Sequence, residues 1–276
     1  MSGKKKKSTK KQSRRIKVFV LTAGLLICCC IVIGILMSVN LTDDYYKIEK
    51  RTSYITKEKK QDEEGVETVA WLRVQGTNID APIIIPDEGK SLGFLEKENF
   101  LWNEDDVKER YNQIKIMGHN ILNLSSTPEV GTDYFTKFED LMAFTYQDFV
   151  KENKYIQYTV DGKDYIYKIF AVLYDKSYNL DLYHNGNYTT EEMKEYITKV
   201  QEKSLYEFDI EVDEKDDIIC LVTCTRMYGV DQKQQFVVVG RLLRKNEQIK
   251  NYTLKTTKEY DKLQKIMKGE TENVEA

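Results

Sequence analysis

The spacing of apolar and polar residues changes several times along this 276-residue chain. Residues 18–39 form a run of 22 residues without a charge, long enough as a helix to cross a hydrocarbon core of ~30 Å. Residues 40–67 are polar and charged with helical spacing, which predicts a stalk and an N-terminal helix. In residues 68–246 short apolar runs alternate with turn residues, which predicts strands. Residues 247–276 predict a short amphipathic helix that fades into a disordered tail.

Strands dominate the pattern of residues 68–246. Residues 154–175 alternate on both sides of Asp161-Gly162, a dipeptide that favours a hairpin turn. Residues 189–208 have helical spacing, with Thr189 or Thr190 as the N-cap. The other predicted strands are VAWLRV (69–74), DAPIII (80–85), QIKIMGHNIL (113–122, ending at Gly118-His119-Asn120), DIICLVTCT (217–225) and QQFVVVGRLLR (234–244). The expected fold is therefore mostly β, a closed barrel with peripheral helices that follows one N-terminal transmembrane helix.

Charge is distributed unevenly and decides the topology. Residues 1–17 hold nine Lys and Arg and no acid, which leaves 33 of the 42 basic residues against all 45 acids, a net charge of −12. The basic tip predicts a cytoplasmic N-terminus, an uncleaved anchor at 18–39 and an extracellular body. A secretory signal would have an apolar region of only ~7–15 residues and a small-residue cleavage site. Membrane lipid is thus an expected partner, whereas nucleic acid is not, because the acidic body would repel phosphates.

The cysteines fall into two groups. Residues 28–30 are three cysteines within the predicted anchor, as apolar filler or as palmitoylation sites. Cys220 and Cys224 stand four apart in one predicted strand, ~13 Å at 3.3 Å per residue, whereas a disulfide needs Cα atoms within ~7 Å. Two unpaired thiols in an exported domain indicate a reactive cysteine. Cys224 is the better candidate because it ends the apolar run and precedes a polar loop.

Two histidines are candidate partners for that thiol. His184 lies in a polar Gly/Asn loop, where a solvated role is expected. His119 directly follows an apolar strand, and a cation near Cys224 would lower the pKa of its thiol. A zinc site of two Cys and two His is disfavoured, because an extended strand holds the two thiols ~13 Å apart. No metal and no cofactor are therefore expected.

These motifs together resemble the sortases, membrane-anchored cysteine transpeptidases of Gram-positive bacteria. The resemblance rests on LVTC (221–224) followed by QFVVVGRLLR, with MGHN about a hundred residues earlier. VAWLRVQGTNIDAPIII, the NF at 99–100 and the helix 189–208 are similar to the class B branch. The similarity covers roughly residues 68–245, and the order His then Cys is the reverse of the papain-like order.

The resemblance implies a mechanism. Cys224 would attack the scissile carbonyl of a sorting signal and form a thioester, which an amine then resolves. His119 would act as general acid for the leaving amine and then as base for the incoming one. Thr223 would help to shape the pocket, with its backbone near the developing oxyanion.

One departure from the family pattern concerns the arginine expected just before the VVV run. This chain has Gln235 there, and an amide can donate a hydrogen bond to an oxyanion but carries no charge. We predict a working but slow enzyme in which Arg226 or Lys233 supplies the missing charge. A catalytically degenerate, membrane-tethered binding module is the alternative.

The partners that the resemblance implies are surface proteins that bear a C-terminal sorting signal. For class B members the signal is similar to Asn-Pro-x-Thr. The acceptor would be the amine of a cell-wall peptide or of a pilin lysine. Wall anchoring and pilus assembly remain open alternatives at this point.

Overall fold

The computed structural model describes residues 20–24, 27, 28, 31, 67–85, 101, 102, 111–118, 137–175, 186–225, 234–249 and 253–270. Contacts divide the chain into two units, residues 1–49 and 50–276. In the first unit the described residues are helical, and Val20, Leu21, Ile27 and Ile31 are exposed. Among the described residues no helix is both long and apolar enough to cross a membrane. Most of the predicted anchor at 18–39 and nearly all of the stalk at 40–67 lie outside them.

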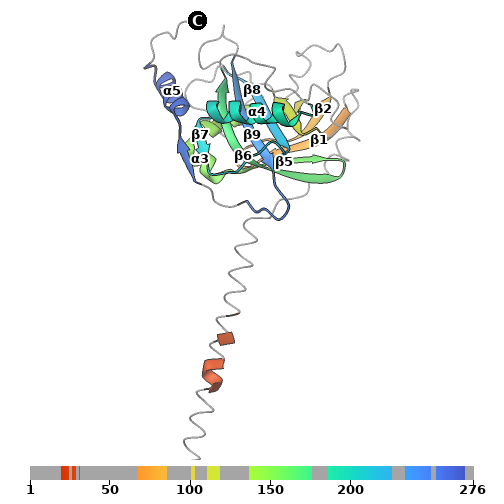
Figure 1. The fold of residues 1–276 in the computed structure, drawn as a ribbon, viewed down its shortest axis with the longest axis vertical. Helices are drawn as coiled ribbons and strands as arrows, with labels where there is room; N and C mark the ends of the chain where they lie inside the picture. Colours follow the sequence, from red (N-terminus) through yellow and green to blue (C-terminus); the bar gives the residue numbers. More distant parts are fainter. Residues whose placement is uncertain are drawn as a thin grey trace, which may run out of the picture. The chain divides into compact units, whose positions relative to one another are not determined.

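The second unit is built on a closed β-barrel (Figure 1). The strands follow one another around it in the order β1–β2–β3–β4–β8–β9–β6–β5, and β1 pairs with β5 to close the circle. All neighbours are antiparallel except the pairs β2–β3 and β4–β8. The strands are β1 (Glu67–Val74), β2 (Asp80–Ile85), β3 (Leu101–Trp102), β4 (Gln113–Gly118), β5 (Tyr155–Val160), β6 (Lys163–Asp175), β8 (Ile218–Cys224) and β9 (Gln235–Leu242). The predicted mostly β fold with peripheral helices is confirmed.

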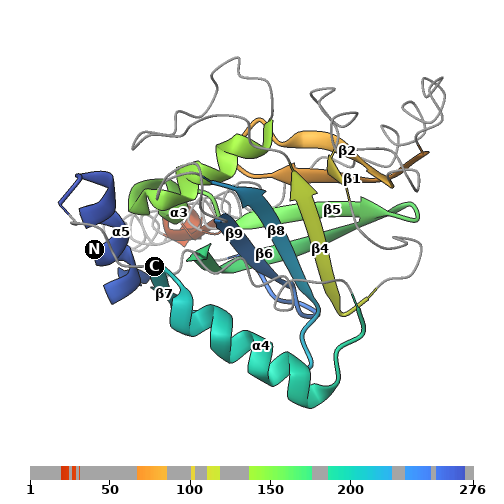
Figure 2. The same cartoon turned by 90° about the horizontal axis from the view of Figure 1, so that it is seen from above.

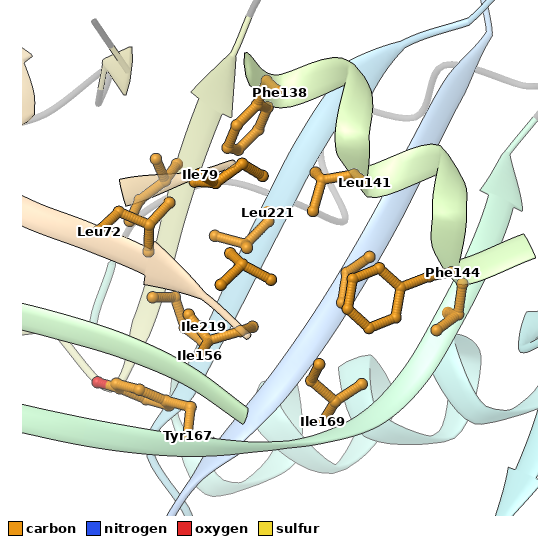
Figure 3. Close-up of a cluster of buried hydrophobic side chains, with 14 of the residues drawn as sticks. Leu72, Ile79, Phe138, Leu141, Phe144, Ile156, Tyr167, Ile169, Ile219 and Leu221 are labelled. Carbon is orange, nitrogen blue, oxygen red and sulfur yellow. The ribbon is translucent and has the colours of Figure 1, made fainter. Parts of the chain in front are cut away.

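The interior of the barrel is filled by every second residue of its strands. Ile219 and Leu221 of β8 point inward, as the two-residue period of a strand requires. The 3-10 helix η2 (Lys137–Thr145) supplies Phe138, Leu141 and Phe144 to the same cluster (Figure 3). A short helix, α3 (Gln147–Glu152), follows η2, and the edge-to-face contact of Phe144 with Phe149 joins the two.

The opposite face of β6, β8 and β9 is covered by α4 (Thr190–Lys203) (Figure 2). The helix begins as predicted at Thr189, whose hydroxyl accepts from the backbone of Glu192 while the Glu192 carboxylate accepts from the backbone of Thr189. Its buried stripe packs on the face of the sheet that points away from the barrel interior. The residues of this contact are Met193, Tyr196, Ile197 and Val200 of α4 with Leu173, Cys220, Val222, Val237 and Val239 of the strands.

The end of this helix corrects the sequence prediction of 189–208. The helix stops at Lys203, and Tyr206–Phe208 form the strand β7, which pairs with β10 (Leu254–Thr256). Ser204 causes the break, because its hydroxyl accepts from the backbone of Val172 and donates to the carbonyl of Tyr206. Beyond β10, the predicted amphipathic helix is present as α5 (Lys258–Met267), capped by the Thr257 hydroxyl.

Candidate active site

Two parallel strands meet at one end of the barrel, one ending in the candidate nucleophile Cys224 and the other ending at Gly118, directly before the candidate base His119 in the sequence. β4 and β8 pair in register from Gln113 opposite Ile218 to Gly118 opposite Thr223. In the sequence His119 follows Gly118, and Cys224 follows Thr223. Cys224 is the last residue of β8, whereas His119 lies outside the described residues. The two neighbouring strands thus end within one residue of each other along the barrel, one strand spacing apart.

Thr223 ties these two strand ends together. It is buried, and its hydroxyl donates to the carbonyl of Gly118 at 3.0 Å. Gly118 itself leaves no room for a side chain, since a Cβ there would lie 2.0 Å from the ring of Phe138. The hydroxyl of Thr223 is therefore used within the barrel wall, and its backbone leads directly into Cys224.

Gln235 stands opposite Cys224. The pairing of β8 with β9 matches Cys224 to Gln235, at the position that the family resemblance reserves for arginine. The side chain of Gln235 is 1% exposed, and its Oε1 has no hydrogen-bond partner in the described structure. A buried amide oxygen without a partner costs free energy, which is typical of a group that a ligand completes.

The next strand adds an ion pair that the sequence did not predict. The pairing of β6 with β9 places Asp175 opposite Gln235, so Cys224, Gln235 and Asp175 form one row across three strands. Asp175 is 2% exposed, and its Oδ1 accepts from the ammonium of Lys203, the last residue of α4, at 3.1 Å. The only sequence signal was an aspartate at the end of an apolar run.

The other cysteine of the barrel strands, Cys220, lies in a different environment. Cys220 is fully buried beneath α4 with a free thiol, and burial raises the pKa of that thiol to about 12, although a hydrogen bond with Tyr196 opposes the shift. A thiol with so high a pKa is inert near neutral pH. Of the two cysteines in residues 40–276, the chemistry thus points to Cys224.

The remaining candidates are not brought to this row by the described structure. Arg226, Lys233 and His184 lie outside the described residues. Arg241 shares a strand with Gln235 but lies at its other end, where it donates to Glu247 at 2.7 Å. Within the described ranges no group of Asp, Glu, His and Cys could hold a metal ion.

Comparisons with known proteins agree on one family. A family model described as "Sortase domain" matches residues 72–243. Sortase B of Listeria monocytogenes is 26% identical over 182 residues, which cover 64% of this chain and 70% of that protein. Sortase B of Staphylococcus aureus is 22% identical over 178 residues, with the same coverage.

Solved structures show the same fold. The Clostridium perfringens sortase B structure aligns with a TM-score of 0.53 at 23% identity and covers 68% of this chain and 100% of that one. A sortase B complexed with Gly3 aligns with a TM-score of 0.55 at 16% identity, over 76% of this chain and 92% of that one. A Staphylococcus aureus sortase B–substrate complex gives 0.52 at 16% identity, over 76% and 99%.

Proposed function

Because the chain belongs to the sortase family and is a sortase-type cysteine transpeptidase, we propose that it uses Cys224 to cleave a C-terminal sorting signal and to transfer the acyl group to an amine. The observation that carries this proposal is the common end of β4 and β8. In that register Gly118 pairs directly with Thr223. His119 and Cys224 are the residues that follow these two in the sequence. Covalent catalysis requires a nucleophile and a base that lie close together, and this register supports such a separation for Cys224 and His119.

The proposed reaction has two steps, acylation of Cys224 and transfer of the acyl group to an amine. The Cys224 thiolate attacks the carbonyl carbon of the scissile bond, and the resulting oxyanion collapses as the C–N bond breaks. His119 gives its proton to the leaving amine, and a thioester remains on Cys224. An incoming amine then attacks the thioester carbon, His119 takes a proton from that amine, and the thiolate leaves as the new amide forms.

Gln235 has a defined part in this scheme. Its Nε2–H groups donate to the oxyanion, whereas a guanidinium would also contribute charge. Arg226 or Lys233 supplies the missing cation from the segment between β8 and β9. Removal of that charge by Arg226→Ala or Lys233→Ala is expected to lower kcat/KM about 10²-fold, the lower end of the range for an oxyanion-stabilising group. If both variants match the wild type, neither residue has this role.

The substrates are proposed from the relatives. One similar structure is a sortase B–substrate complex and another contains Gly3, which supports an extended peptide as donor and a short amine as acceptor. We assign to this chain a class B type signal similar to Asn-Pro-x-Thr, with a cell-wall peptide or a pilin lysine as acceptor. The exposed apolar residues of the N-terminal helix and the basic residues 1–17 support a membrane anchor with the barrel outside the cell.

The test uses full-length protein in detergent micelles, a library of Asn-Pro-x-Thr type peptides and triglycine. Mass spectrometry should detect an acyl adduct on Cys224 and a peptide–triglycine product. Cys224→Ala should abolish both, whereas the control Cys220→Ala, in the buried site, should retain both.

Gln235 in place of arginine also favours a second candidate, a binding module without chemistry. Peptide binding without any adduct or product would support that module and overturn the transpeptidase proposal for this chain.

A further inference from the structure

Gln113, the first residue of β4, carries a buried amide with unfilled hydrogen-bonding capacity. Its side chain is 0% exposed, and neither Oε1 nor Nε2 has a hydrogen-bond partner in the described structure. It pairs in register with Ile218, so its side chain shares the face of the sheet on which Ile218 packs with α4. Gly118 ends the same strand, and this amide therefore lies away from the candidate active site.

Residues 186–188, which lead into α4, are fastened to the start of β4. The backbone of Gln113 donates to Gly186 at 3.2 Å and accepts from it at 3.1 Å. Asn112 donates from Nδ2 to the carbonyl of Tyr188 at 2.9 Å, and its Oδ1 accepts from the N–H of Tyr188 at 2.8 Å. These bonds use the backbone of Gln113 and the side chain of Asn112. They hold the entry of α4 against β4 and leave the amide of Gln113 unsatisfied in the described structure.

Other polar groups gather on the same face of the sheet. Lys115 is 1% exposed and stands opposite Cys220 in the register of β4 and β8. Tyr196 of α4 forms a hydrogen bond with the Cys220 thiol, and the ring of Tyr188 contacts the ring of Tyr196 edge to face at 5.8 Å. The amide of Gln113 thus has polar neighbours, and polar surroundings are what a buried solvent molecule requires.

The amide defines the chemistry of the ligand that would satisfy it. A buried amide loses its hydrogen bonds to solvent on folding, so an unsatisfied Oε1 and an unsatisfied Nε2 each cost free energy. A ligand for both atoms must donate to Oε1 and accept from Nε2, which water does and which neither an anion nor a metal ion can do. We propose that Gln113 binds an internal water molecule between the start of β4 and α4. Buried waters typically make about three hydrogen bonds, and Lys115 or Tyr196 can supply the third.

The first test removes the amide at nearly constant side-chain volume. In Gln113→Met the water loses its main partners, so the urea midpoint of the full-length protein in detergent micelles should fall. If no molecule satisfied the amide, the apolar side chain would remove a penalty and the midpoint should rise. Gln157→Met is the comparison variant, because Gln157 is also 0% exposed but its Nε2 donates to Asp164 at 3.1 Å. The fall in that variant gives the size of the effect at an amide whose partner is known.

The second test observes the water directly by NMR in full-length protein with isotope-labelled glutamine. The Nε2–H protons of Gln113 should show a nuclear Overhauser contact with water, of the sign that is typical of a long-lived bound molecule. A rotating-frame measurement separates this contact from proton exchange with the solvent. The loss of the signal in Gln113→Met assigns it to this residue.

A fall of the midpoint together with the water contact supports the proposal. A midpoint that is unchanged or raised, or Nε2–H protons of the wild type that show no contact with water, overturns it. If Gln113→Met fails to fold, the water contact in the wild type decides alone, with the signal assigned through the backbone of β4. The inference is independent of the proposed function, because Gln113 and Gly118 lie at opposite ends of β4. Transfer activity per folded molecule should therefore be unchanged in Gln113→Met.

Discussion

The two ends of strand β9 differ in how their buried polar side chains are hydrogen-bonded. At its start, Gln235 is buried with an unpaired Oε1 beside the position of Cys224. At its end, Arg241 is equally buried but donates to Glu247 and to the carbonyl of Leu242. Lys168 contacts the same Glu247 at 3.3 Å. Three hydrogen bonds to charged or carbonyl oxygens fix the guanidinium of Arg241, although its Nε has no hydrogen-bond partner in the described structure, so this end serves the fold. At the other end the Oε1 of Gln235 lacks a partner beside the proposed nucleophile, where a bound peptide could supply one.

The largest expected effect is at Cys224, the end of β8 that pairs with the start of β9. Cys224→Ala should lower transfer activity by about 10⁴-fold or more, because loss of a nucleophile removes the covalent step. The free energy of unfolding from urea titration should change little. Activity within 10-fold of the wild type would contradict the assignment of Cys224.

At the Arg241 end of β9, a substitution should lower stability and not activity. Arg241→Met leaves Glu247 with less compensation and should lower the free energy of unfolding by about 3–5 kcal/mol. Transfer activity per folded molecule should be unchanged. The double variant Arg241→Met/Glu247→Leu should lose less, since it removes both charges. A stable Arg241→Met protein with impaired transfer would reverse the contrast between the two ends.

The same network predicts a dependence of stability on pH. The hydrogen bond from Arg241 is the main cause that lowers the pKa of Glu247 to about 2 from the usual value of 4.5. Because the pKa is lower in the folded state, this stabilisation is complete above pH 4.5 and is lost as the pH falls toward 2. Glu247→Gln should flatten the urea midpoint across that window. A variant with the same acid sensitivity as the wild type would exclude Glu247 as its source.

A smaller effect on kcat/KM is expected when a charge is introduced at Gln235. Gln235→Arg restores the family residue beside Asp175, and the new guanidinium should pair with that carboxylate. On its own it should raise kcat/KM by only a few-fold. In an Asp175→Asn background it should raise kcat/KM about 10-fold, less than the ~10²–10³-fold effect of a whole oxyanion-hole donor, because Gln235 already supplies a hydrogen bond. Equal gains in both backgrounds would show that Asp175 does not compete for the arginine.

Local patterns in the sequence predicted the elements, and pairing between distant segments decided the site. The hairpin turn was predictable because Asp161 and Gly162 adopt positive φ values of 49° and 71°, as Asp-Gly allows. The N-cap at Thr189 was equally local. The resemblance to sortases pointed to Cys224, His119 and Gln235, and the register of β8 and β9 agrees with the carried-over position of Gln235.

Asp175 could not be predicted, because its place in the row depends on the pairing of β6 with β9. That pairing contains a register shift between Ile169 and Ala171, which no pattern in either strand announces. The end of α4 was missed for a similar reason. Residues 204–208 have helical spacing, but their pairing with Leu254–Thr256, nearly fifty residues later, draws them into a strand.

The hydrogen bond from Thr223 to Gly118 joins residues 105 positions apart. Contacts of such wide sequence separation form only after the chain entropy of a long loop has been overcome. Before the last strands have paired, Cys224 and His119 therefore belong to segments of the chain that move independently. Formation of the thioester should therefore begin only when the final strands have joined the barrel. Incompletely folded molecules would then not react with the peptide.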